Sequence, residues 1–166
     1  LGEFNYMEVT EPVLHVNSET LKISSSYYLE FIDITEKVED VIKNSNVTNG
    51  IVVVFSKHTT SAIVIQENEP LLLEDFKVVI ENIAPSSAKY RHNDFETRTV
   101  HMHDDELPNG HSHCQHLYLG SSETVPIIDG KMPLGQWQRI FMVELDGGKA
   151  AQVDYREVVV QVLGQS

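Results

Sequence analysis

The residues best suited to chemistry lie in the stretch NGHSHCQHL at positions 109–117, which holds three histidines and the only cysteine of the chain. On a helix, His113 and His116 share a face and His111 points nearly opposite to His113, whereas on a strand His111 and His113 share a face. A catalytic zinc ion usually takes three protein ligands and keeps one open position. The stretch is therefore incomplete as a metal site, and other segments must complete it.

Histidines in other segments are the candidates to complete such a site. His58 follows the apolar run IVVVF in SKHTTS, His92 lies in YRHND, and His101 and His103 lie in VHMHDDE. Each has a structural alternative, because a histidine can end a strand with a hydrogen bond and a polar loop can simply be solvated. Cys114 could act as a thiolate ligand or nucleophile, although a lone cysteine on a helix is more often a small buried side chain.

Composition limits the class of protein. The chain has 166 residues, 41% hydrophobic residues and a net charge of −13, which fits one globular domain. It has no basic run for nucleic-acid binding and no apolar stretch near the roughly 20 residues that span a membrane. A single cysteine excludes an internal disulfide, which together with the absence of a visible secretion signal favours a cytoplasmic protein. Residues 1–6, LGEFNY, resemble a cloning scar, which leaves a single domain over 7–166.

The elements that must position these residues are strands and a few helices. Runs of β-branched and aromatic residues predict strands within 9–33, which could form a hairpin, and then at 51–55, at 61–66 and in three runs after 122. Helices are predicted from an N-cap at Thr35, from Pro70 to just before Pro85, and from an Asn109 cap to Leu119. Asp-Gly pairs at 129–130 and 146–147 predict hairpin turns.

This order of elements predicts an α+β fold: a single compact domain whose largely antiparallel sheet packs against a few helices. The polar segment 86–110 lies between two predicted helices. Loops of this length within a compact domain are usually functional or disordered. We therefore expect this segment to contribute to a site.

Five blocks of sequence carry a resemblance to a known family. They are HTTSAIVIQENEP (58–70), YRHND (90–94), NGHSHCQHLYLGSS (109–122), VPIIDGKMPLGQWQRIFMVELDG (125–147) and the terminal VVVQVLG. On these blocks the chain resembles the YjbQ family of secondary thiamine-phosphate synthases, from about Ile51 to the C-terminus. It departs from the family pattern at Gln66, Asn93 and Gln136, and its HMHDDELPNG stretch is longer than is common in the family.

The resemblance implies a YjbQ-like fold that assembles as a homotrimer, with sites near the subunit boundaries. It also implies that His58, His92 and His113 are the ligands of a divalent metal ion, with zinc expected first and magnesium second. Three histidines from three segments agree with the ligand count of an open metal site. The roles of His111, His116, Cys114 and the 99–108 insertion stay unassigned.

The reaction that the resemblance implies, thiamine-phosphate synthesis, expels pyrophosphate and requires groups that neutralise these leaving phosphates. The chain offers hydroxyls and one arginine for substrate binding: Thr59, Thr60, Ser61, Ser122 and Arg91. Glu67 is expected to act as general acid or base, or else to be a carboxylate favoured by a helix N-terminus. Asp94 is the next candidate for a catalytic base.

The expected function is a metal-dependent enzyme that acts on a small phosphorylated or heterocyclic substrate, with a weak thiamine-phosphate synthase side activity. Two alternatives stay open at this point: a metal-dependent hydrolase, and a non-enzymatic trimeric accessory protein that binds a metal or another ligand. A small molecule is the expected partner, and neither nucleic acid nor a membrane is.

Overall fold

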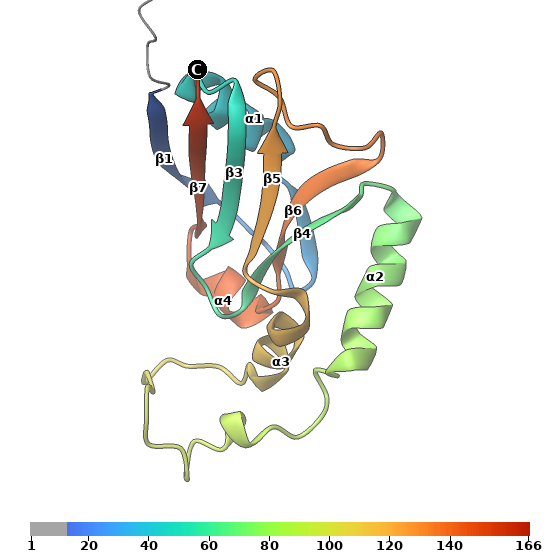
Figure 1. The fold of residues 1–166 in the computed structure, drawn as a ribbon. Helices are drawn as coiled ribbons and strands as arrows, with labels where there is room; N and C mark the ends of the chain where they lie inside the picture. Colours follow the sequence, from blue (N-terminus) through green and yellow to red (C-terminus); the bar gives the residue numbers. More distant parts are fainter. Residues whose placement is uncertain (1–12) are drawn as a thin grey trace, which may run out of the picture.

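Two antiparallel sheets form the framework of the molecule (Figure 1). The computed structural model describes residues 13–166, so the proposed scar at 1–6 lies outside the described residues. The first sheet has the strand order β1 (Leu14–Ile23), β7 (Arg156–Gln165), β3 (Asn49–Ser56) and β5 (Ser122–Ile127). The second has the order β2 (Glu30–Asp33), β6 (Gln138–Glu144) and β4 (Ser61–Glu67). The predicted α+β class with antiparallel pairing is confirmed.

Four α-helices and one short 3-10 turn complete the described chain. They are α1 (Thr35–Ser45), α2 (Pro70–Ile83), the 3-10 turn Arg91–Asn93, α3 (Gly110–Leu119) and α4 (Gly147–Gln152). The helices predicted after Pro70 and Asn109 are thus present, and α2 ends just before Pro85 as expected. Among residues 13–166, no helix is both long enough and apolar enough to cross a membrane.

The three-stranded sheet is buried on both faces, which explains the continuous apolar run of β6. One face packs against the four-stranded sheet, with Ile63 and Met142 facing Val54 and the apolar side of α1. The opposite face, with Phe141 and Val143, packs against Ile80 of α2 and its neighbours. A strand covered on two sides reads as an unbroken hydrophobic run instead of an alternating one.

Some local predictions were wrong, mostly because neighbouring strands belong to different sheets. β1 and β2 do not form a hairpin, since β1 pairs with β7 and β2 pairs with β6. Asp129 and Gly130 do form a tight turn with positive φ, but β5 and β6 on either side of it also enter different sheets.

Two helix starts also differ from expectation. Thr35 is the first residue of α1 and does not cap it; its hydroxyl donates to Asp33 and accepts from the backbone N–H of Ile140. The residues after Asp146 form α4 in place of a hairpin turn, because the Asp146 side chain accepts from Lys149 N at 2.9 Å and caps a helix.

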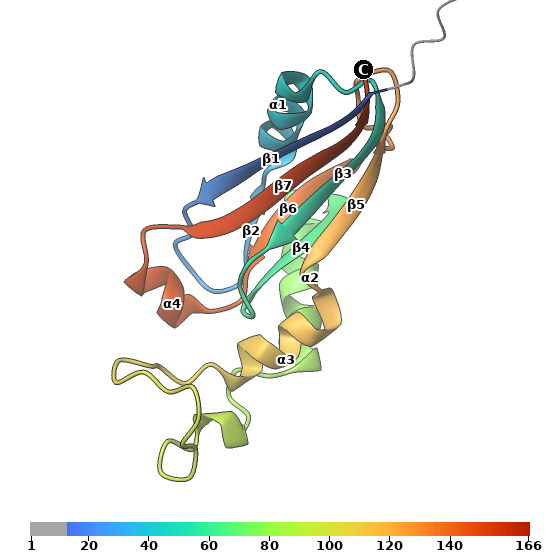
Figure 2. The same cartoon turned by 60° about the vertical axis from the view of Figure 1, so that its left-hand side comes forward.

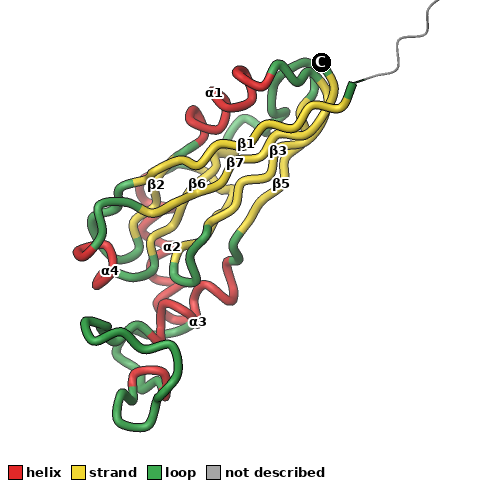
Figure 3. The backbone as a smooth tube through the Cα atoms, turned by 90° about the vertical axis from the view of Figure 1, so that its left-hand side faces the viewer, coloured by secondary structure: helices red, strands yellow, loops and turns green. Residues whose placement is uncertain are grey.

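One end of the molecule gathers the segments of chemical interest. Figures 2 and 3 show α3, α4 and the long segment between α2 and α3 below the ends of the strands, far from α1 and the C-terminus. β3 ends and β7 begins at this end. His58, just after β3, therefore lies beside the start of β7, where Arg156 is located. The antiparallel pairing of β3 with β7 therefore joins positions about a hundred residues apart in the chain.

Candidate functional site

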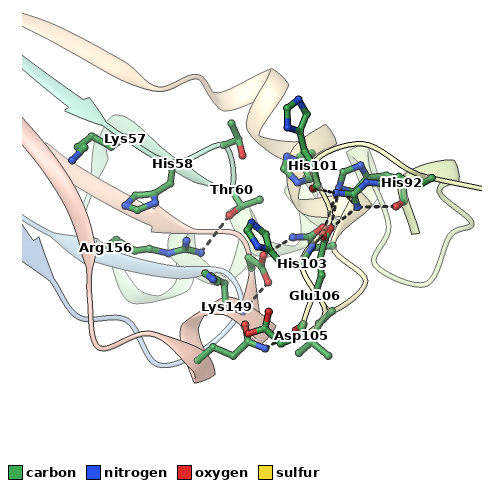
Figure 4. A pocket seen from close by; sticks show the side chains of 17 residues that line it. Lys57, His58, Thr60, His92, His101, His103, Asp105, Glu106, Lys149 and Arg156 are labelled. Carbon is green, nitrogen blue, oxygen red and sulfur yellow. Dashed lines mark hydrogen bonds and ion pairs between the residues drawn. The ribbon is translucent and has the colours of Figure 1, made fainter. Parts of the chain in front are cut away.

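A cavity of about 730 Å³ lies at this end of the molecule. Its walls come from the loop after β3, the segment between α2 and α3, the start of α3, and the region of α4 and β7 (Figure 4). Five of the eight histidines of the chain line it: His58, His92, His101, His103 and His113. Four cationic side chains, Lys57, Arg98, Lys149 and Arg156, line it too, although the chain as a whole is strongly acidic.

Arg156 forms the most deeply buried part of the lining. The residue is 2% exposed, and its Nε and Nη2 donate to the two carboxylate oxygens of Glu144 at 2.7 and 2.6 Å. Nη2 also donates to the hydroxyl of Thr60 at 3.3 Å, a contact drawn in Figure 4. Glu144 is fully buried and accepts further bonds from Ser25 and from the backbone N–H of Asp146. A bidentate pair of this kind fixes the plane of the guanidinium group.

His58 is held by a backbone donor. The N–H of Glu157 donates to His58 Nε2 at 2.8 Å, so Nε2 carries the lone pair and the proton of the neutral ring is on Nδ1. Burial, followed by the nearby Arg156, lowers the pKa of His58 below its ordinary value. His58 is therefore a neutral ring that presents an N–H donor.

His113 and His92 meet on the opposite wall. Their ring centroids are 4.6 Å apart in an edge-to-face arrangement. Burial, followed by the neighbouring His92, lowers the pKa of His113. The His113 ring lines the cavity and has no hydrogen-bond partner within residues 13–166. A neutral imidazole with an unused lone pair is suited to accept a proton from a bound molecule.

Arg98 holds the segment between α2 and α3 in place as one wall of the cavity. Its guanidinium group forms a two-pronged ion pair with Glu106 and donates to the carbonyl oxygens of His92 and His101. The resulting pairing lowers the pKa of Glu106. This explains why a polar stretch of that length has a defined path beside the cavity, with its histidines and acids on one side (Figure 4).

The residues expected from the sequence divide between cavity and surroundings. His58, His92, His113, Thr59 and Thr60 line the cavity. The remaining expected site residues do not line it: Ser61, Glu67, Arg91, Asp94 and Ser122. Ser61 is fully buried, whereas Arg91 and Asp94 border a separate shallow depression. The carboxylate that caps α2 belongs to Glu69, which accepts from Leu71 N and Leu72 N.

The expected metal centre does not fit this arrangement. Within residues 13–166, no group of three or more histidine, cysteine, aspartate or glutamate side chains is placed to hold a metal ion. His58 gives a physical reason, because one ring nitrogen accepts from a backbone N–H and the other must then carry the proton. His58, His92 and His113 thus share a cavity without forming a three-ligand site for zinc or magnesium.

Sequence reasoning missed the charged residues around the histidines. Arg156, Glu144, Asp146 and Lys149 were not singled out, yet Arg156 and Glu144 form the buried ion pair beside the cavity. A signal was available, because both residues interrupt apolar strand runs, in FMVEL and YREVVV. Charged side chains are almost never fully buried unless they are paired, so two of them in buried strands point to an ion pair.

Comparisons with known proteins identify relatives along most of the chain. The model of the family described as "UPF0047 protein YjbQ-like" matches residues 19–165. A UPF0047 protein of Methanothermobacter thermautotrophicus is 41% identical over 140 residues, which cover 84% of this chain and 90% of that protein. A UPF0047 protein of Archaeoglobus fulgidus is 34% identical over 143 residues, which cover 86% of this chain and 98% of that protein.

Solved structures agree with this relationship. A YbjQ-like protein of unknown function from Sulfolobus solfataricus superposes with a TM-score of 0.80 at 33% identity, covering 92% of this chain and all of that one. A hypothetical protein from Aeropyrum pernix gives a TM-score of 0.72 at 31% identity, covering 90% and 98% of the two chains.

These findings correct the expected function. The relatives are described by a family number and by no activity, and the described residues form no metal site, so the expected metal-dependent enzyme with thiamine-phosphate synthase activity is wrong. The metal-dependent hydrolase and the metal-binding accessory protein fail on the same ground. The resemblance itself is confirmed: the chain belongs to the UPF0047 family of YjbQ-like proteins.

Proposed function

We propose that the cavity binds a small anionic molecule and that His113 takes up a proton from solution when the anion binds. Arg156 carries this proposal: it lines the cavity, and its Nη1 has no hydrogen-bond partner within residues 13–166. Nη1 is not among the fully buried polar atoms that lack a partner, so its two N–H groups are open to the cavity, where a ligand that accepts from them can replace water. Because the group is cationic, the acceptor that it favours most is an anion.

Thr60 and His58 add donors beside Arg156. The hydroxyl of Thr60 accepts from Arg156, which leaves its own hydrogen free to donate to a ligand. His58 has its proton on Nδ1, because Nε2 accepts from the backbone of Glu157. These neighbours support anion binding because each presents a hydrogen rather than a lone pair.

His113 supports the second half of the proposal. Its pKa is lowered chiefly by burial, so the ring is neutral at pH 7 and can accept a proton. An anion bound nearby stabilises the imidazolium form and raises the pKa of His113. Binding near neutral pH should then draw a proton from the buffer.

Calorimetric titration tests both parts at once. Acetate and inorganic phosphate are titrated into the protein at pH 7 in two buffers with different ionisation enthalpies. We expect saturable binding of at least one anion together with net proton uptake, which His113→Gln abolishes while binding persists. Lys149→Gln, at the exposed rim, should weaken binding while leaving the fold intact, and Arg91→Gln serves as a control outside the cavity.

The outcomes separate clearly. Binding that is equally strong in Lys149→Gln and wild type, or the absence of saturable binding by either anion, contradicts anion recognition at this cavity. Proton uptake that survives in His113→Gln contradicts the role given to His113. Lys149 is chosen because substitution of Arg156 would leave Glu144 buried without its partner and could unfold the protein.

We also propose that the protein self-associates as a homotrimer, which the resemblance implies. The outer face of the four-stranded sheet supports this. Val16, Leu163, Ile51 and Pro126 are paired across β1, β7, β3 and β5, so they lie in one row on the same face. Val16 is 60% exposed and Ile51 is 38% exposed. A solvated face of an antiparallel sheet is normally polar, and an apolar one marks an interface.

A further inference from the structure

The cationic side chains of the cavity are mostly neutralised already. Lys57 pairs with Glu157 at 2.6 Å, Arg98 pairs with Glu106, and Arg156 pairs with Glu144 at 2.6 Å. Lys149 is the fourth cation, and it has no ion-pair partner within residues 13–166. A ligand therefore meets one free positive charge and several neutralised ones.

Two further carboxylates line the cavity. Asp105 and Asp146 both belong to the lining, and Asp146 is buried. Counted with the three paired acids, five carboxylates stand against four cations, so the surroundings carry about one net negative charge when the imidazoles are neutral. Glu144, Asp146 and Arg156 are buried and therefore weakly screened by solvent, whereas Asp105 and Lys149 are exposed. Each additional negative charge on a ligand adds to its repulsion by the excess carboxylate.

The free donors are also few and lie together. Arg156 has only Nη1 left, because Glu144 and Thr60 engage its other nitrogens. The Thr60 hydroxyl adjoins the same guanidinium group. Nη1 and the Thr60 hydroxyl can each donate to one oxygen of a carboxylate, and the N–H of His58 is the other neutral donor beside them. A phosphate group has three or more oxygens to satisfy, and its sites usually surround it with several cations and backbone N–H groups.

We infer that the ligand of this cavity is a singly charged carboxylate and not a phosphate ester or a diphosphate. This inference rests on the proposed function, since it specifies the anion that the cavity takes. It would make the chain selective for small organic acids, with Arg156 and Thr60 holding the carboxylate and Lys149 supplying the balancing charge from the rim. Asp105 and Asp146 would act against anions of higher charge.

Separate titrations with four anions at pH 8 test the selectivity of the cavity. This pH is well above the ordinary pKa of an imidazole, which is near 6.5. Acetate, propionate, inorganic phosphate and pyrophosphate are titrated into the wild-type protein while the backbone amide resonances of residues 57–60 are followed by NMR. We expect the carboxylates to bind at least about tenfold more tightly than phosphate, a difference of about 1.4 kcal/mol.

A matched pair of variants tests the cause. Asp105→Asn removes one carboxylate from the lining and should narrow the preference to about threefold, because repulsion of the doubly charged phosphate falls more than that of acetate. Asp104→Asn removes the same charge from a neighbouring residue that does not line the cavity, and it should leave the preference unchanged. Equal effects of the two variants would show that the selectivity does not arise from the lining.

The result also separates this inference from the proposed function. Phosphate or pyrophosphate binding as tightly as acetate overturns the carboxylate assignment and leaves anion recognition standing. Saturable binding of none of the four probes overturns both. A carboxylate preference that responds to Asp105→Asn and not to Asp104→Asn supports both.

Discussion

Hydrogen bonds, more than residue type, decide what each histidine of the cavity can do. His58 and His113 are both half-buried, and burial is the main cause of the lowered pKa of each. The backbone of Glu157 nevertheless occupies one nitrogen of His58, while the His113 ring has no such partner in the described chain. Spacing along the chain cannot distinguish the two, because the donor to His58 lies 99 residues further on.

The tautomer of His58 is directly measurable. Because a backbone N–H can only donate, we expect His58 to carry its proton on Nδ1, with Nε2 unprotonated. Long-range ¹H–¹⁵N NMR spectra at pH 8 report the protonation of each ring nitrogen. The spectrum of the His58→Gln variant assigns the signal. A protonated Nε2 would contradict the arrangement and would restore the possibility that Nδ1 binds a metal.

The histidines of the cavity could be predicted from the sequence, whereas the ion pair of Arg156 and Glu144 was not. His58, His92 and His113 were candidates because each lies in a separate segment that matches the family's recurring histidines, and all three line the cavity. The ion pair was not predicted, because it depends on β6 and β7 leading into one region although they belong to different sheets. Both residues interrupt apolar strand runs, but only the tertiary structure shows that they meet and that burial makes each dependent on the other.

Breaking this pair should be costly. Arg156→Met leaves Glu144 fully buried without its counter-charge, so we expect the free energy of unfolding to fall by about 3–5 kcal/mol. Urea denaturation followed by circular dichroism gives the value. Lys57→Met removes a cation from an exposed pair with Glu157 and should change stability little. Similar losses in the two variants would mean that the buried pair is not the cause.

Helices α2 and α3 form where local sequence signals predicted them. α2 begins at a proline and ends before another, and α3 spans the helix predicted between Asn109 and Gly120. α4 was missed because Asp-Gly suggested a hairpin, although an aspartate is equally suited to cap a helix. The choice depended on Asp146 being buried beside Glu144 and Asn109, which only the tertiary structure shows.

The histidines of α3 should make stability sensitive to mild acid. Burial is the first cause of a lowered pKa for His111, His113 and His116, so the unfolded chain binds more protons below pH 6.5. Stability should therefore be full above pH 6.5 and fall as the pH drops below it. Urea unfolding at pH 7.5, 6.5 and 5.5 measures this slope.

A variant identifies the source of that slope. His116→Gln removes one of the three groups and should flatten the dependence between pH 6.5 and 5.5, whatever its effect on absolute stability. Carboxylates with lowered pKa lose their contribution only below about 4.5, so they act in a separate range. A slope unchanged by the substitution would contradict the assignment.

The start of α2 distinguishes two neighbouring glutamates. Glu69 accepts from Leu71 N at 3.0 Å and from Leu72 N at 2.7 Å, whereas Glu67 lies at the end of β4. Glu69→Ala should lower the free energy of unfolding by about 1 kcal/mol, the usual effect of losing an N-cap. Glu67→Ala is the matched control and should cost clearly less. A larger loss in Glu67→Ala would reverse the assignment.

At the scale of the whole molecule, the division into two sheets was beyond the sequence. Alternating and continuous apolar runs predicted strands and their burial, but not which strands share a sheet. The apolar runs account for the core between the two sheets. They do not account for the apolar residues on the outer face of the four-stranded sheet, which nothing in the described part of the chain covers. Figure 1 shows this four-stranded sheet in front of the other elements, next to the end that holds the cavity.

This outer face should be where copies of the chain meet. Ile51 is 38% exposed and Phe55 is 43% exposed, on the same side of β3. Ile51→Lys should convert the proposed homotrimer to a monomer, because burying an unpaired lysine at an interface costs more than the contact gains. Light scattering after size-exclusion chromatography measures the mass. Circular dichroism checks that the fold persists, as expected for an outward-facing position.

A second substitution decides whether the effect is specific to this face. Val78 is 60% exposed on α2, on the opposite side of the three-stranded sheet from β3, and is equally able to accept a lysine. Val78→Lys should leave the mass unchanged if the outer sheet face forms the interface. A wild-type protein that is already monomeric at micromolar concentration contradicts the proposed trimer, and a trimer disrupted only by Val78→Lys moves its interface to α2.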